Sequence, residues 1–197
     1  MDTLRTTCVE SLAAHIRAVA QSTGQAFIVA LDGPSGAGKS TLAMALAMEI
    51  NAACIDGYDF YAGGINLRVD SPAERANACI DWPRQRQVLQ ALRAGQPAEW
   101  RAFDWDNFDG RLVYPAAKLS PAKYTILEGV YAARPELADL LDMRVLVEVA
   151  PDIRKARLLA REGAIGPWEQ QWHEAEEHYY RYVMTAERFE LIYCESL

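Results

Sequence analysis

Residues 33–40 carry the clearest chemical signature in the chain, because they read GPSGAGKS and match the phosphate-loop pattern G-x-x-x-x-G-K-[ST] at every fixed position. Glycines in this pattern let several backbone N–H groups approach phosphate oxygens closely. Lys39 is expected to reach the β- and γ-phosphates of a nucleoside triphosphate, and the Ser40 hydroxyl to ligate Mg²⁺. We therefore predict a site for ATP and Mg²⁺ formed by Gly33, Pro34, Ser35, Gly36, Ala37, Gly38, Lys39, Ser40 and Thr41.

Three acidic residues could carry the proton chemistry of phosphoryl transfer. Transfer to a hydroxyl needs a carboxylate that takes the acceptor's proton, while Mg²⁺, Lys and Arg meet the charge on the transferring group. Asp56 and Asp59 lie just past one predicted strand, and Glu128 ends another, followed by Gly129, which leaves room for a ligand. Asp56 and Asp59 could instead cap a helix or a turn, as Glu128 could.

Three arginines could meet the phosphates from a separate helix, predicted at residues 151–162. Arg154, Arg157 and Arg161 are spaced i, i+3 and i+7, which places them on one helix face. Planar guanidinium groups suit phosphoryl oxygens, so we expect at least one of these arginines to bind phosphate. The alternative is a solvated basic face.

The elements that must position these groups follow an alternating order of strand and helix. The phosphate loop lies between a short apolar run at residues 26–31 and a segment rich in helix formers at residues 41–50. Further strands are predicted at residues 52–56, 124–127, 143–149 and 191–194. This alternation predicts an α/β three-layer sandwich of the P-loop NTPase type, with a parallel sheet of about five strands, in a single domain.

The remaining segments are predicted to be helices or an insertion. Apolar residues spaced by three and four predict one amphipathic helix over residues 4–21, ended by Ser22, Thr23 and Gly24. Residues 57–110 form an irregular aromatic and acidic insertion with one helix at 83–94, and we expect it to bind substrate or to seal the domain's edge. A short helix is predicted near residues 135–141, and helices over residues 152–183 are expected to form a lid.

Composition narrows the class of partner. The chain has 197 residues, is 51% hydrophobic and carries a net charge of -7. These values predict a globular protein that does not bind nucleic acid as its main ligand. The sequence has neither a membrane-length apolar run nor a signal-peptide pattern, and its four cysteines are scattered, so we expect a cytoplasmic protein with reduced thiols. A homo-oligomer is left open.

The histidines and two tryptophans match no catalytic pattern. His173 and His178 are predicted to decorate a solvated helix face together with Glu174, Glu176 and Glu177. His15 has no assigned role. Trp168 and Trp172 are predicted to be packing residues.

Taken together, the motifs resemble a known family from about residue 28 to the end of the chain. GPSGAGKSTLA, D-F-Y about twenty residues later, F-D-W, ILEGVYA and an arginine-bearing helix are similar to the uridine kinase-like group of P-loop kinases. That group includes uridine-cytidine kinase, nicotinamide riboside kinase, pantothenate kinase and phosphoribulokinase. The resemblance implies an ATP- and Mg²⁺-dependent phosphotransferase acting on a hydroxyl of a small metabolite, most similar to a uridine or cytidine kinase.

The resemblance also implies residue roles. Asp59 keeps the family's spacing from Lys39 and is expected to be the general base, with Asp56 in reserve. Glu128 is expected near Mg²⁺ together with Ser40. Arg154, Arg157 and Arg161 resemble lid arginines, with Arg157 assigned to catalysis. The implied acceptor-binding residues are Tyr61, Asp81, Phe103, Asp104 and Arg111.

This sequence departs from the family in the region of base recognition. Tyr58 replaces the first acid of D-D-F-Y, Phe103 replaces a tyrosine, and an expected histidine is absent near Asn107 and Arg111. The acceptor could therefore be pantothenate, nicotinamide riboside, a sugar or another alcohol. A third reading is a nucleotide-binding regulator without transferase activity, although the N-K-x-D guanine motif of a GTPase is absent.

Overall fold

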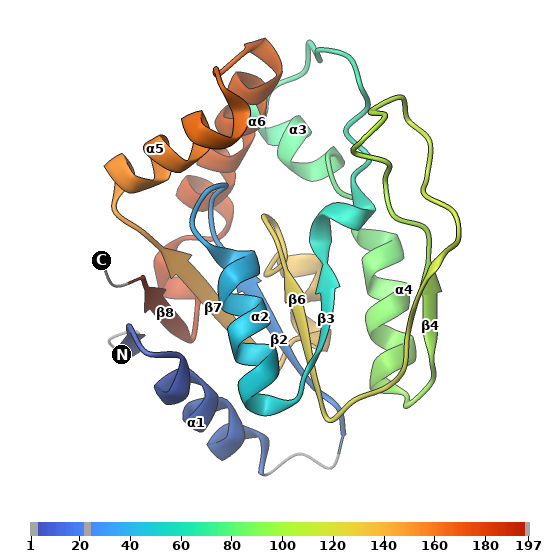
Figure 1. Cartoon of the computed structure of the whole chain (residues 1–197), viewed down its shortest axis with the longest axis vertical. Coiled ribbons are helices and arrows are strands. Elements are labelled where there is room, and N and C mark those ends of the chain that lie inside the picture. The colour runs from blue at the N-terminus through green and yellow to red at the C-terminus, as the bar shows by residue number, and fades with distance from the viewer. Residues whose placement is uncertain (1–3, 22–24, 196–197) are drawn as a thin grey trace.

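Six parallel strands form the central sheet of the computed structural model, which describes residues 4–21 and 25–195 (Figure 1). Their order in the sheet is β1-β8-β7-β2-β6-β3. The strand bounds are β1 Leu4–Thr6, β2 Phe27–Asp32, β3 Ala53–Asp56, β6 Tyr124–Glu128, β7 Met143–Glu148 and β8 Leu191–Cys194. The predicted α/β fold is confirmed, with one strand more than the five expected.

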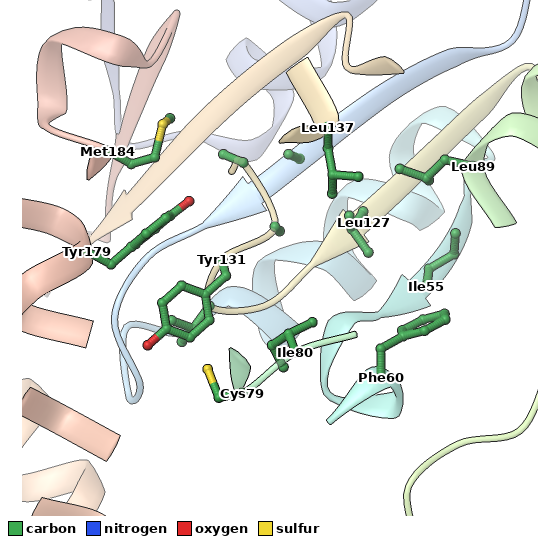
Figure 2. Packing of buried hydrophobic residues seen from close by; sticks show 14 of the residues in the cluster. Ile55, Phe60, Cys79, Ile80, Leu89, Leu127, Tyr131, Leu137, Tyr179 and Met184 are labelled. Carbon is green, nitrogen blue, oxygen red and sulfur yellow. The ribbon is translucent and has the colours of Figure 1, made fainter. Parts of the chain in front are cut away.

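Side chains that alternate along the strands fill two cores, one on each face of the sheet. On β2, Ile28 and Ala30 belong to one buried cluster, while Val29 and Leu31 belong to the other. All six residues of β2 are buried, as expected for a central strand of a parallel sheet covered on both faces. Figure 2 shows part of the first cluster, where Leu127 of β6 lies close to Leu137.

Helices cover both faces of the sheet. α1 (Val9–Ala20) and α2 (Lys39–Ile50) pack on one face, and α4 (Trp82–Arg93) with the 3₁₀ helix η2 (Pro135–Leu140) packs on the other. Within the described residues, no helix has the length and apolar character needed to cross a membrane.

The single helix predicted over residues 4–21 is wrong at its start. Residues Leu4–Thr6 form β1, which pairs in parallel with β8 through Leu4 and Leu191, and the helix begins only at Val9. The backbone groups of these residues find their hydrogen-bond partners in β8 rather than in a helical first turn. This tertiary pairing overrides the helical periodicity of the local sequence. The predicted stop at Ser22, Thr23 and Gly24 lies outside the described residues.

The insertion is more regular than predicted. After the 3₁₀ turn η1 (Gly57–Phe60) comes a helix that the prediction missed, α3 (Pro72–Ala78), opened by a capping box between Ser71 and Glu74. α4 follows close to its predicted position. β4 (Ala98–Trp100) then pairs antiparallel with β5 (Ala117–Leu119), a hairpin that was also missed.

Two helices stand over the carboxyl end of the sheet, at the top of Figure 1. They are α5 (Pro151–Glu162) and α6 (Pro167–His178), and α6 continues into a π-helical turn, η3 (Tyr179–Val183). A 3₁₀ turn, η4 (Ala186–Arg188), then leads into β8. The predicted pair of C-terminal helices is confirmed, and they cover the phosphate loop.

Candidate active site

The phosphate loop adopts a backbone that depends on its glycines. Gly36 and Gly38 have φ angles of 80° and 93°, which side chains disfavour. A Cβ at Gly33 would lie 2.5 Å from the carbonyl oxygen of Val147, so the loop can pass β7 only with glycine there. α2 begins directly after Gly38 and directs its partly positive N-terminus at the loop.

Lys39 is buried inside this loop and is only 5% exposed. Its Nζ donates a hydrogen bond to the carbonyl oxygen of Pro34 at 3.1 Å. Burial lowers the pKa of Lys39, and the nearby charges of Glu176 and Glu128 oppose that shift. A cavity of about 450 Å³ opens beside it, lined by Gly36, Gly38, Lys39, Ser40, Thr41, Tyr58, Arg157, Arg161 and Glu195.

The three arginines of α5 all face the loop, as their spacing predicts. Arg157 and Arg161 line the loop cavity, where Arg157 pairs with Glu195. Arg154 donates to the carbonyl oxygen of Ser35 at 3.2 Å. The structure therefore brings together the loop residues and the arginines assigned to phosphate binding.

Glu176 of α6 is buried against the same loop, which corrects the prediction that it lies on a solvated face. It is 2% exposed, and its carboxylate accepts hydrogen bonds from the backbone N–H of Ser35 at 3.2 Å and from the Ser35 hydroxyl. The indole Nε1 of Trp172 donates to the same carboxylate, and Arg154 lies 3.6 Å from it. Because the residues around Glu176 in the sequence are polar, the sequence did not indicate that one face of α6 packs on the loop.

Asp32, which sequence reasoning did not single out, lies at the end of β2 and is fully buried. Its carboxylate accepts five hydrogen bonds from the first loop residue, the segment after β6 and the π-helical turn: Gly33 N, Tyr131 N, Ala133 N, Tyr179 OH and Tyr180 OH. Burial raises the pKa of Asp32, and these hydrogen bonds oppose the shift. The only sequence signal was an acid between an apolar strand and a glycine.

Asp56 and Glu128 lie side by side because they are register partners at the ends of β3 and β6. Glu128 is buried near Ser40, and its Oε2 atom has no hydrogen-bond partner among the described residues. A buried carboxylate oxygen without a partner, beside a serine hydroxyl, fits a hard cation such as Mg²⁺, which takes one or two carboxylates plus phosphate oxygens. Within the described residues, no group of three or more His, Cys, Asp and Glu could hold a metal by itself.

The two candidate bases differ in their partners. Asp59 accepts a hydrogen bond from the indole Nε1 of Trp100 at 2.7 Å, so its Oδ2 is engaged. Among the described residues, Asp56 accepts only from the backbone N–H of Tyr58, at 2.8 Å, and it lines a cavity. Burial raises the pKa of Asp56, and the neighbouring charge of Asp59 adds to the increase.

That cavity, of about 370 Å³, lies between the insertion and the helices α5 and α6. It reaches the loop at Ser35, and aromatic rings form much of its wall. The lining residues are Ser35, Asp56, Tyr58, Trp105, Arg161, Glu162, Trp168, Glu169, Trp172 and His173. Trp168 and Trp172, predicted to be packing residues, thus also face this cavity.

The predicted acceptor-binding residues lie outside the lining of this cavity. Asp81 caps α4 by accepting from the N–H of Arg84, and Asp104 accepts from the backbone and side chain of Asn107. Arg111 is exposed and pairs with Asp109. Phe103 and Tyr61 are 5% exposed and contact each other behind the cavity wall. None of the five is among the residues that line the cavity.

Comparison with known proteins is consistent with this arrangement. The family model described as cytidylate kinase matches residues 29–77. Uridine-cytidine kinase C of Dictyostelium discoideum is 24% identical over 127 residues, which is 64% of this chain and 28% of that protein. For uridine kinase-like protein 3 of Arabidopsis thaliana, identity is 24% over 146 residues, 71% of this chain and 31% of that protein.

A third relative, inorganic pyrophosphatase TTM1 of Arabidopsis thaliana, is 30% identical over 132 residues, 66% of this chain and 20% of that protein. This chain therefore spans less than a third of the length of the curated relatives described here.

Two solved structures share the fold over nearly the whole chain. A possible uridine kinase from Bacillus stearothermophilus superposes with a TM-score of 0.69 at 18% identity, covering 94% of this chain and 96% of that one. D-glycerate 3-kinase from Cryptococcus neoformans gives a TM-score of 0.57 at 15% identity, covering 92% and 88%. At these identities the likeness is one of fold.

Proposed function

We propose that this chain, which belongs to the uridine kinase-like family of P-loop kinases, transfers the terminal phosphoryl group of ATP to a hydroxyl of a small metabolite. One observation carries the proposal: the cavity that contains Asp56 reaches the phosphate loop at Ser35 and shares Tyr58 and Arg161 with the loop cavity. An alcohol in one cavity can thus meet a triphosphate in the other.

The reaction follows from the groups at this junction. The acceptor oxygen forms a bond to the γ-phosphorus, the bond from that phosphorus to the β,γ-bridging oxygen breaks, and ADP leaves. The hydroxyl proton passes to a carboxylate. Lys39, Arg157 and Arg161 meet the charge on the transferring oxygens, where preorganised positive groups stabilise the transition state.

Asp56 is the better supported base of the two candidates. It lines the acceptor cavity with one carboxylate oxygen free of protein hydrogen bonds in the described residues, and its raised pKa makes it a stronger proton acceptor. Asp59 remains the alternative, because in the described residues Trp100 engages only its Oδ2. Ser40 and Glu128 would hold Mg²⁺, which when bound supplies charge neutralisation at the phosphates.

Two classes of acceptor are candidates. The first is a nucleoside such as uridine or cytidine, which is supported by the aromatic walls because they suit a planar ring. The second candidate is another alcohol, such as pantothenate, nicotinamide riboside or a sugar. It is favoured by the position of Asp81, Asp104 and Arg111 away from the cavity, since these were the residues expected to recognise a nucleoside.

An acceptor-dependent ADP-release assay with Mg²⁺ tests the proposal. We expect turnover with at least one alcohol and its loss in Lys39→Ala, with ordinary folding by circular dichroism. An active Lys39→Ala protein would contradict the proposal. ATP binding by calorimetry without acceptor-stimulated ADP release would favour the third reading, a nucleotide-binding regulator.

A further inference from the structure

The acceptor cavity has a second property beyond its position: four aromatic rings that line it contact one another in a closed circuit. Tyr58 and Trp105 lie 6.1 Å apart between ring centroids, and Trp105 and Trp168 lie 6.3 Å apart. Trp168 and Trp172 are 5.9 Å apart and nearly parallel, and Trp172 and Tyr58 close the circuit at 5.8 Å. Each of the four lines the cavity, and we call them the aromatic cage.

The polar part of the same wall is mainly acidic. Asp56, Glu162 and Glu169 line it, against Arg161 as the only Lys or Arg among its lining residues in the described chain. Arg161 also lines the loop cavity, so a triphosphate there would compensate its charge. Glu162 accepts from Arg161 through Oε1, while its Oε2 is buried without a partner in the described residues. Glu169 has one oxygen, Oε2, engaged by the N–H of Gly166.

We propose that the acceptor is a cationic alcohol, with its positive charge held in the aromatic cage. A cation is attracted to the faces of Trp and Tyr rings, and enclosure by several rings is the arrangement that binds quaternary ammonium groups. The carboxylates of Glu162 and Glu169 add attraction without requiring a hydrogen bond from the ligand. This inference rests on the proposed function, because it defines the class of acceptor for the same site.

Anionic and neutral acceptors fit this cavity less well. A carboxylate-bearing alcohol such as pantothenate would place a negative charge beside Asp56, Glu162 and Glu169. A neutral sugar could donate hydroxyls to these acids, but would make little use of the four aromatic rings. Among the acceptors already considered, the nicotinamide riboside cation has the required charge.

Two pairs of probes separate charge from shape. Choline and 3,3-dimethylbutan-1-ol have nearly the same shape, but only choline is charged; nicotinamide riboside and uridine are a cationic and a neutral nucleoside. We expect the cation of at least one pair to bind about tenfold or more tightly than its neutral partner, measured by calorimetry and by quenching of tryptophan fluorescence. Equal or tighter binding of both neutral probes, or no binding of either cation at millimolar concentration, would overturn the inference.

Charge-neutralising variants provide the second arm. Glu162→Gln and Glu169→Gln should each lower the affinity for the cationic probe severalfold and leave the affinity for its neutral partner nearly unchanged. Glu177→Gln is the matched control, because Glu177 is exposed, pairs with Arg181 and lies outside the cavity lining. An equal loss for cation and neutral probe in the first two variants would indicate a structural role and count against the inference.

The two proposals fail in different ways. Turnover of uridine or another neutral alcohol, with no preference for cations, would leave the kinase intact and remove the cationic acceptor. Selective cation binding without ADP release from any of the alcohols tested, charged or neutral, would support the cage and contradict the transferase.

Discussion

Three of the carboxylates near the phosphate loop, those of Asp32, Glu128 and Asp56, are distinguished by their hydrogen-bond partners. Asp32 has both oxygens engaged and serves as a structural acceptor. Glu128 retains an unpartnered buried oxygen, which suits a cation, and Asp56 opens onto the acceptor cavity. The position of an acidic residue in the sequence does not reveal which of these roles it has. The hydrogen-bond donors around its carboxylate do reveal it.

Asp56→Asn tests the choice of base at this scale. Because an amide cannot take the acceptor's proton, we expect kcat to fall about 10²–10⁴-fold. Asp59→Asn should cost less, since its carboxylate accepts from Trp100 rather than facing the cavity. Steady-state ADP release from the two variants decides between them, and the reverse order of losses would restore Asp59 as the base.

The raised pKa of Asp56 predicts a pH dependence. Only the ionised carboxylate can act as base, so kcat/KM should fall as the pH decreases through the pKa of Asp56. Burial and the charge of Asp59 raise that pKa, so this limb of the pH profile, the fall in kcat/KM, should lie at higher pH than for an ordinary aspartate. A pH profile of kcat/KM measures it, and Asp59→Asn should shift the limb to lower pH by removing the neighbouring negative charge. An unmoved limb in that variant would assign the titration to another group.

At the scale of elements, α6 is connected to the phosphate loop mainly through Glu176 and Trp172. Both side chains bond to Ser35, and Arg154 of α5 bonds to the carbonyl of the same residue. Ser35 is therefore a point where α5, α6 and the loop meet. A triphosphate entering the loop would change the charges around this junction.

Removing the Glu176 carboxylate should loosen α6. Glu176→Ala leaves the Ser35 N–H without its acceptor and the Trp172 indole with only the Ser35 hydroxyl, which we expect to cost about 2–3 kcal/mol of unfolding free energy. Amide hydrogen exchange should become faster in α5 and α6 than in the sheet. Glu177→Ala, an exposed neighbour, should change stability by less than about 0.5 kcal/mol. Equal exchange in both variants would show that Glu176 does not hold the helix.

At the scale of the whole molecule, Asp32 joins segments about 100 to 150 positions apart in the chain. The phosphate loop, the turn after β6 and the π-helical turn all donate to this one side chain. The loop's position thus depends on the C-terminal third of the fold, and not only on the strand and helix that flank it.

Asp32→Ala should destabilise the entire protein. Several buried donors lose their acceptor together, so we expect a loss of about 3–5 kcal/mol in urea unfolding. Asp152→Ala, at an exposed position in the first turn of α5, should cost under about 1 kcal/mol. Similar midpoints for the two variants would mean that the Asp32 network adds little to stability.

The amino-acid sequence alone determined the phosphate loop, the inner strands and the order of most helices. These features arise from local patterns: a glycine motif whose residues are consecutive, apolar runs of strand length, and helix periodicity. Where a distant partner decided the local structure, prediction was wrong, as at Leu4–Thr6, which pairs with β8 instead of extending α1.

Only the tertiary structure decided which side chains share a cavity. Glu176 meets Ser35 across 141 positions, and Tyr58 meets Trp172 across the space between the insertion and α6. The aromatic cage, the engagement of Asp59 by Trp100 and the network of Asp32 depend on such contacts. Because burial and hydrogen bonding between distant segments set these relations, no spacing within one segment could reveal them.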